Sequence, residues 1–176
     1  FSINTVAGDG DSTTLSSAAI ALDGSGNLFI ADSANHQVRK LTANGTLQTI
    51  AGDGVSGFSG DDGPALSAHL STLGGLAIDG QGDVFVVDAG NQRVRRVSKN
   101  GTITTVAGNG AAGFSGDRGP AIAAQLHDPS GVAVDSAVNL FIADTGNHRI
   151  RMVSPCGTVS TIAGNGLAGF SGDGGA

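Results

Sequence analysis

Residues 26–41 read GNLFIADSANHQVRKL, and the same pattern returns as GDVFVVDAGNQRVRRV at residues 82–97 and as VNLFIADTGNHRIRMV at residues 138–153. The copies are spaced 56 residues apart in a chain of 176 residues. Self-similarity at a fixed period is typical of proteins built from repeated supersecondary units. The sequence therefore predicts three copies of one structural unit.

Each repeat contains four strand-like runs. A short run of small residues is followed by an apolar run, then by a run that mixes Arg with Val or Ile, and then by a Thr-, Ile- and Val-rich run. The second run is apolar at successive positions, which indicates a strand covered on both faces. Turns such as Asn44-Gly45 and Asn100-Gly101 favour tight hairpins. The runs are residues 19–23, 28–31, 36–41 and 46–51, then 75–79, 84–87, 92–97 and 102–107, then 131–135, 140–143, 148–153 and 158–163.

Four antiparallel strands with two apolar faces describe one blade of a β-propeller, so we predict an all-β propeller with three blades in this chain. The small first strand suits the crowded centre where blades converge. We predict that the whole chain forms one propeller domain or a segment of one. Residues 1–18 are expected to hold the outer strand of a preceding blade, at residues 2–7, and a linker. The repeats follow at residues 19–74 (repeat 1), 75–130 (repeat 2) and 131–176 (repeat 3 and a truncated linker).

Three blades cannot close a ring, because propellers usually have four to eight. We expect the remaining blades to come from a longer chain. The alternative is a 3+3 homodimer, which would leave a surplus fourth strand at each junction.

Composition excludes some classes of function. The formal net charge is −6, and the chain has no Trp or Tyr, so nucleic acid is not an expected partner. No apolar run is long enough to span a membrane. The start of the sequence has no signal-peptide pattern, although a removed signal would leave none. The single cysteine, Cys156, cannot form an internal disulfide.

The repeats resemble the NHL repeat, which is named for an Asn-His-Leu tripeptide. The corresponding tripeptides begin at Asn35, Asn91 and Asn147; the third position departs in all three, and the second copy lacks the His. The linkers GFSGDDGPA (residues 57–65) and GFSGDRGPA (residues 113–121) are similar to a subtype common in exported bacterial proteins. The resemblance implies a propeller, often of six blades, with a binding surface and an extracellular or periplasmic location.

Charged residues that recur in every repeat are interpreted as structural. Asp32, Asp88 and Asp144 end the second strand-like run, where a carboxylate can accept hydrogen bonds from turn amides or pair with a third-strand Arg. The alternative is a ring of catalytic or metal-binding carboxylates. Seven of the nine basic residues lie on the third runs, where they can cover apolar surface or pair with acids, or alternatively bind an anion. These seven are Arg39, Lys40, Arg93, Arg95, Arg96, Arg149 and Arg151.

The Gly-rich linkers are interpreted as structural loops. The aspartate that all three linkers share (Asp61, Asp117 and Asp173) supplies too few carboxylates for a calcium site. Phe58 and Phe114 are predicted to be buried between blades, because glycine and serine neighbours cannot shield an aromatic ring. Phe170 is predicted to be less buried, because this chain does not contain the next blade.

The remaining candidates are weaker. His36, His69, His127 and His148 are scattered over the repeats, whereas a zinc site needs converging ligands. Cys156 replaces the Asn of an Asn-Gly turn and has no evident base partner, so it is interpreted as a turn variant. Asn44 and Asn100 also fit the N-glycosylation sequon, but the turn explains both.

These observations predict a non-enzymatic binding or scaffolding propeller with a protein or a glycan or other small ligand, and without catalytic residues, cofactor or metal. The alternative is part of a metal-dependent lyase or lactonase whose catalytic residues lie in other blades. No transition metal is expected to copurify, because no cluster of ligands is visible in the sequence.

Overall fold

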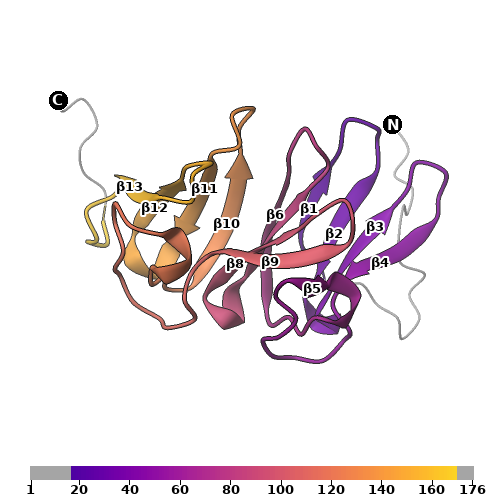
Figure 1. Cartoon of the computed structure of the whole chain (residues 1–176), viewed down its shortest axis with the longest axis horizontal. Helices are drawn as coiled ribbons and strands as arrows, with labels where there is room; N and C mark the ends of the chain where they lie inside the picture. The colour runs from indigo at the N-terminus through magenta and orange to yellow at the C-terminus, as the bar shows by residue number, and fades with distance from the viewer. Residues whose placement is uncertain (1–16, 170–176) are drawn as a thin grey trace.

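The computed structural model describes residues 17–169 as three antiparallel sheets, which stand side by side as blades (Figure 1). Within each blade the strands pair in sequence order, which confirms the predicted four-stranded units. Blade 1 consists of β1 (Ser17–Leu22), β2 (Leu28–Asp32), β3 (Gln37–Leu41) and β4 (Leu47–Ala51). Blade 2 consists of β6 (Leu73–Ile78), β7 (Val84–Asp88), β8 (Arg93–Val97) and β9 (Thr102–Ala107). Blade 3 consists of β10 (Pro129–Val134), β11 (Leu140–Asp144), β12 (Arg149–Val153) and β13 (Val159–Ala163).

The described helical elements are short 3-10 turns. They are η1 (Ser33–Asn35), η2 (Ala65–Ser67), η3 (Ala89–Asn91), η4 (Ala121–Ala123) and η5 (Thr145–Asn147). Within residues 17–169 no helix has the length and apolar character needed to cross a membrane. The strand predicted at residues 2–7 lies outside the described residues.

The register of the strands repeats from blade to blade. The same third-strand arginine lies opposite an apolar residue of the second strand, and an irregularity between the third and fourth strands recurs at that arginine in each blade. The opposed pairs are Ile30 with Arg39, Val86 with Arg95, and Ile142 with Arg151. Equal positions in the three copies of the sequence therefore occupy equal positions in the fold.

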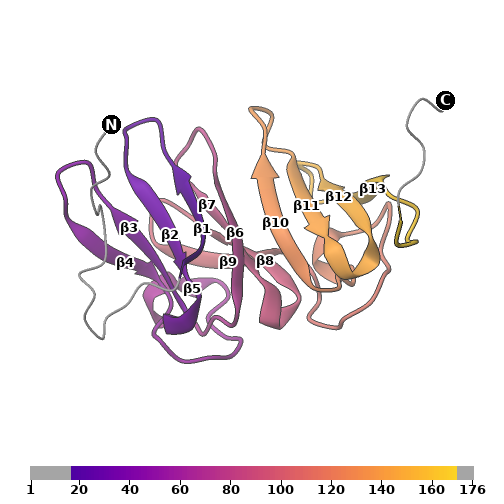
Figure 2. The same cartoon turned by 180° about the vertical axis from the view of Figure 1, so that it is seen from behind.

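The first strands of the blades meet where the blades converge, as their small residues predicted. Figure 2 shows β6 between β1 and β10, and both neighbours contact it. Gly75 of β6 lies against the backbone of β10, because a Cβ atom at Gly75 would be 2.9 Å from the Cα atom of Gly131. Only a residue without a side chain fits this approach.

Gly75→Ala is expected to lower the free energy of unfolding by about 1–3 kcal/mol, because the backbone of β10 must move to accept the methyl group. Gly131→Ala is the matched control: the nearest atom to its added Cβ, that of Ala143, is 3.6 Å away. The control should stay within about 0.5 kcal/mol of the parent or gain stability. Denaturant unfolding measures both, and equal losses would contradict the close approach of β6 and β10.

Apolar side chains fill the two spaces between blades. Phe29 and Val38 of blade 1 belong to one cluster with Leu76, Val86 and Ile103 of blade 2. A second cluster joins the other face of blade 2 to blade 3, and its members include Phe85, Val94, Leu140, Ile142 and Val153. Because β7 contributes to both clusters, all five of its residues are buried. This explains the continuous apolar run seen in the sequence.

The linkers pair with the outer strands of the blades, which the sequence pattern did not predict. After leaving blade 1, the chain forms β5 (Gly63–Pro64), which pairs with Thr102 and Ile103 at the outer edge of blade 2. The next linker repeats this path with a bridge between Pro120 and Thr158. Each linker thus covers part of the outermost strand of the next blade, where unpaired backbone groups would otherwise be exposed.

Candidate functional site

The second-strand aspartate of blade 2 is held by a set of hydrogen bonds. Asp88 is fully buried. Its carboxylate accepts hydrogen bonds from the Asn91 side chain at 2.8 Å and from the Ser71 backbone N–H at 2.8 Å, and lies 3.3 Å from Nη1 of Arg95. Burial raises the pKa of the Asp88 carboxyl, while these hydrogen bonds and the Arg95 charge oppose the rise. The predicted pairing of this aspartate with a third-strand arginine is confirmed.

Arg95 extends the same network to the linker that precedes blade 2. Its Nη2 donates to the Asp61 carboxylate at 2.8 Å and to the Ser59 carbonyl at 3.0 Å. The Asn91 side chain also donates to the Gly57 carbonyl at 2.7 Å. Blade 2 therefore binds the incoming linker through two side chains. We call Asp88, Asn91, Arg95 and Asp61 the clasp of blade 2.

Blade 3 carries an equivalent clasp of Asp144, Asn147, Arg151 and Asp117. Arg151 is fully buried and lies 3.2 Å from Asp144 and 3.0 Å from Asp117. In blade 1, Asp32 accepts hydrogen bonds from Asn35 and lies 3.6 Å from Arg39, while the linker that precedes this blade is outside the described residues. In blades 2 and 3 the buried Arg thus joins the blade to its linker through Asp61 and Asp117.

The predicted burial of Phe58 and Phe114 is wrong. Both rings are 42% exposed. The ring of Phe58 stacks on the guanidinium group of Arg93, with the Arg93 Cζ atom 3.7 Å from the ring centroid, and Arg149 lies 3.8 Å from the centroid of Phe114. A planar cation can cover one face of an aromatic ring and leave the other in solvent. Phe170 and Asp173 lie outside the described residues.

Phe114→Ala is therefore expected to lower the free energy of unfolding by about 1–2 kcal/mol, because it removes a half-exposed ring and its cation–π contacts with Arg149 and Arg151. The control is Phe85→Ala, because Phe85 is buried in the second apolar cluster and its loss should cost about 3–5 kcal/mol. Denaturant unfolding of the two variants measures the difference. A loss at Phe114 that equals the loss at Phe85 would contradict the half-exposed stack.

The turn after the second strand explains the tripeptide of the NHL resemblance. The asparagine belongs to the clasp, and the next residue has a left-handed backbone: φ is 52° at His36, 53° at Gln92 and 51° at His148. The third strand of blade 1 consequently begins at Gln37, one residue later than expected. The second position of the tripeptide thus has a backbone role, and His and Gln both fulfil it.

The four histidines do not converge. His69 lies 3.1 Å from Asp53, and His127 lies 3.7 Å from Asp128, in different linkers. Within the described part of the chain, no group of three or more His, Cys, Asp or Glu side chains could hold a metal. Cys156 is an exposed free thiol in the turn before β13.

A groove of about 490 Å³ lies between blades 1 and 2. Its apolar side chains include the buried Phe29, Val84 and Val97 and the exposed Leu66. Polar side chains come from β3, β4 and the turn between β8 and β9. The lining residues are Phe29, Lys40, Gln48, Thr49, Ile50, Pro64, Leu66, Gly82, Val84, Val97, Ser98, Lys99, Asn100 and Gly101.

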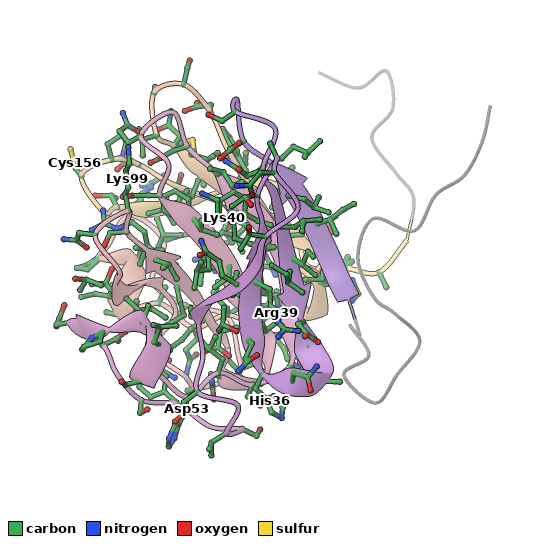
Figure 3. All side chains as sticks on the ribbon, turned by 90° about the vertical axis from the view of Figure 1, so that its right-hand side faces the viewer. His36, Arg39, Lys40, Asp53, Lys99 and Cys156 are labelled. Atoms are coloured by element: carbon green, nitrogen blue, oxygen red, sulfur yellow. The ribbon has the colours of Figure 1, made fainter. Side chains whose placement is uncertain are left out.

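Two of the lining residues, Lys40 and Lys99, were not recognised as a pair from the sequence. Lys40 was assigned to the structural third-strand cations, and Lys99 was not assigned. Figure 3 shows both in the upper half of the view, away from Arg39, His36 and Asp53 in the lower half. The signal in the sequence was that neither lysine is repeated. The positions equivalent to Lys40 are Arg96 and Met152. The positions equivalent to Lys99 are Ala43 and Pro155.

A second cavity, of about 380 Å³, lies beside the clasp of blade 2. Phe58, Asp61 and Arg93 line it, together with Thr105 of β9. These side chains already contact one another: Arg93 stacks on Phe58, and the Thr105 hydroxyl donates to Asp61 at 2.6 Å. This cavity is bordered by the repeated structural residues, whereas the larger groove is lined by residues particular to its two blades.

Comparison with known proteins supports the repeat assignment. The family model of the NHL repeat matches residues 126–151. NHL repeat-containing protein 2 of Gallus gallus is 34% identical over 105 residues, which are 58% of this chain and 14% of that protein. Teneurin-1 of Mus musculus is 36% identical over 102 residues, or 51% of this chain and 4% of that protein. The chain thus spans only a small part of these relatives.

Solved structures share the blade arrangement at lower sequence identity. An auxiliary nutrient binding protein from Bacteroides thetaiotaomicron has a TM-score of 0.64 and 21% identity, with 81% of this chain and 36% of that chain covered. Virginiamycin B lyase from Staphylococcus aureus has a TM-score of 0.57 and 13% identity, with 84% of this chain and 41% of that chain covered. The family match and the three repeated blades together lead to one assignment. The chain contains NHL repeats that fold as blades of a β-propeller.

Proposed function

We propose that this chain is a non-enzymatic binding part of an NHL propeller, and that it holds a protein, a glycan or a small molecule in the groove between blades 1 and 2. The observation that carries the proposal is that the repeated polar residues and the polar residues of the groove are different sets. The repeated Asp, Asn and Arg residues are engaged in the clasps, whereas the groove has a volume of about 490 Å³ and polar side chains that differ from blade to blade. A concave site of this size with an apolar floor is typical of ligand pockets.

The competing proposal is an enzyme of the lyase or lactonase type, since propellers of this fold include virginiamycin B lyase. Fold alone does not assign an activity. We favour binding because the described histidines lie in separate blades and linkers, and because the recurring carboxylates are buried and hydrogen-bonded. A location outside the cytoplasm, a longer chain or a 3+3 homodimer, and the absence of a nucleic-acid partner stay predictions.

The purified chain, applied to glycan and peptide arrays, tests the proposal. We expect at least one ligand class whose binding slows hydrogen exchange at residues 47–50 of β4 and at residues 97–101, the end of β8 and the turn to β9. Protection at other residues only would overturn the assignment to the groove. Elemental analysis and a lactone-hydrolysis assay form the second arm, and one transition metal per chain together with turnover would favour the enzyme.

A further inference from the structure

We propose that the groove between blades 1 and 2 binds a small amphipathic organic anion, with Lys40 and Lys99 on its charged group and the apolar floor against its hydrocarbon part. This inference rests on the proposed binding function and specifies its ligand class.

The first support is the distribution of lysine. The chain contains only two lysines, Lys40 on blade 1 and Lys99 on blade 2, and both line this groove. They lie 59 positions apart in the sequence, so the packing of blade 1 against blade 2 brings them to the same site. In a chain of net charge −6, the groove thus gathers two positive charges.

The second support is the availability of these charges. Among the ion pairs within residues 17–169, all the cations are Arg or His, and neither lysine ammonium lies within 4.0 Å of a carboxylate. The acids near the groove are otherwise engaged: Asp83 accepts a hydrogen bond from the Lys99 backbone N–H at 2.9 Å and lies 3.8 Å from Arg96. The Lys40 ammonium instead lies 5.1 Å from the centroid of the Phe29 ring. Hydrogen bonds from Asn27, with a smaller contribution from the Lys40 charge, lower the pKa of the Asp23 carboxyl. Within residues 17–169 neither ammonium group forms a close ion pair, so both can still bind an anion.

The third support is the surface beneath the lysines. Phe29, Val84 and Val97 are buried in the walls, and Leu66, which is 57% exposed, projects from η2 at the edge. An exposed leucine beside an aromatic floor favours a ligand with a hydrocarbon body. A volume of about 490 Å³ suits a small molecule better than a folded partner. An inorganic anion would use the lysines and leave the apolar surface in water.

The other blades show that this pair is specific to its groove. At the position of Lys40, blade 2 has Arg96, which lies 3.8 Å from Asp83, and blade 3 has Met152. At the position of Lys99, blade 1 has Ala43 and blade 3 has Pro155. Since the blade fold accepts these other residues, neither lysine is required by the architecture. This lack of a structural requirement supports a role in ligand recognition.

The same repetition supplies variants that should fold. Lys40→Met with Lys99→Ala uses residues that blades 3 and 1 carry at these positions. Arg118→Asp is the matched control, because it lowers the net charge by the same two units and uses the residue of the equivalent position 62. Asp62 and Arg118 also have nearly the same backbone, with φ of 63° and 67°. Denaturant midpoints close to that of the parent check that both variants are folded.

The experiment titrates the whole chain with 8-anilinonaphthalene-1-sulfonate, a fluorescent amphipathic anion, and then displaces the dye with octanoate or octanol. We expect the lysine double variant to bind the dye about tenfold more weakly, as the loss of two partly exposed ion pairs implies, and the Arg118→Asp variant to bind within about twofold of the parent. Octanoate should displace the dye at lower concentration than octanol, and added salt should weaken the binding.

Amine acetylation followed by mass spectrometry gives an independent readout, because Lys40 and Lys99 carry the only side-chain amines of the chain. Octanoate should slow acetylation at both lysines. Unchanged dye affinity in the double variant, or equal displacement by octanol, would overturn the anion class. If array ligands still protect the groove in that case, the broader binding function stands while this inference fails.

Discussion

Arg95→Met is expected to lower the free energy of unfolding by about 3–5 kcal/mol, since it removes one partner of a buried charge pair and leaves the other unpaired. Arg95 is fully buried between Asp88 and Asp61. Methionine can fill much of the space but donates no hydrogen bond, so Asp88 keeps its burial and loses its cation. Loss of the contact to Asp61 also weakens the attachment of the linker to blade 2.

Arg96→Met is the matched control, because it removes the same charge at the next residue. The Arg96 side chain is 43% exposed and lies 3.8 Å from Asp83, and blade 3 already has Met152 at this position. Its cost should stay below about 1 kcal/mol. Denaturant unfolding of both variants is the measurement, and similar losses would show that the clasp contributes no more than a surface charge.

The cost of Arg95→Met should also depend on pH. Burial raises the pKa of Asp88, and removal of the opposing Arg95 charge raises it further. The folded variant would then bind a proton at a pH where the unfolded chain, with an ordinary Asp pKa near ~4, is still ionised. The destabilisation should therefore shrink as the pH falls from 7 toward 5. A loss that grows on acidification would contradict this account of Asp88.

Gly108→Ala is expected to cost about 3 kcal/mol or more, from the sum of backbone strain and overlap. Gly108 follows β9 with a φ of 90°, and a Cβ atom there would overlap the carbonyl oxygen of Gln92 and lie 3.0 Å from the Cα atom of Arg93. Both neighbours are backbone atoms, so no side chain can move aside. The left-handed residue of the tripeptide turn and this glycine therefore depend on each other.

Gly101→Ala isolates the strain from the overlap. Gly101 has a similar φ of 85°, but nothing lies within 4 Å of the position its Cβ would take. Its cost should be only the strain of about 1–2 kcal/mol. Thermal or denaturant unfolding compares the two alanines, and equal costs would show that the approach to Gln92 is not tight.

Much of the clasp could be predicted from its residues. The repetition of Asp88 and Arg95 at a fixed spacing indicated a structural pair, and the small residues of the first strands indicated a crowded centre. The exposure of Phe58 could not be predicted in this way, because it depends on Arg93, which lies 35 positions further along the chain. An aromatic residue among glycines indicates a contact but does not tell whether its partner is apolar or a cation.

The groove illustrates the same limit for function. The sequence contained Lys40 and Lys99, but their pairing follows from the packing of blade 1 on blade 2. The repeated residues form the clasps, because repetition marks what every blade needs. A ligand site on a repeat protein can instead lie where the copies differ.

The sequence by itself determined the repeat, the order of the strands and the pairing of the repeated aspartates with third-strand arginines. These features depend on local periodicity and on the same pattern occurring three times. Only the tertiary structure decided the path of the linkers, the half-exposed stack of Phe58 on Arg93, and the presence of both lysines in one groove. The physical reason is that the linkers are rich in glycine, whose backbone has many allowed conformations. Contacts with the next blade therefore select the path of each linker.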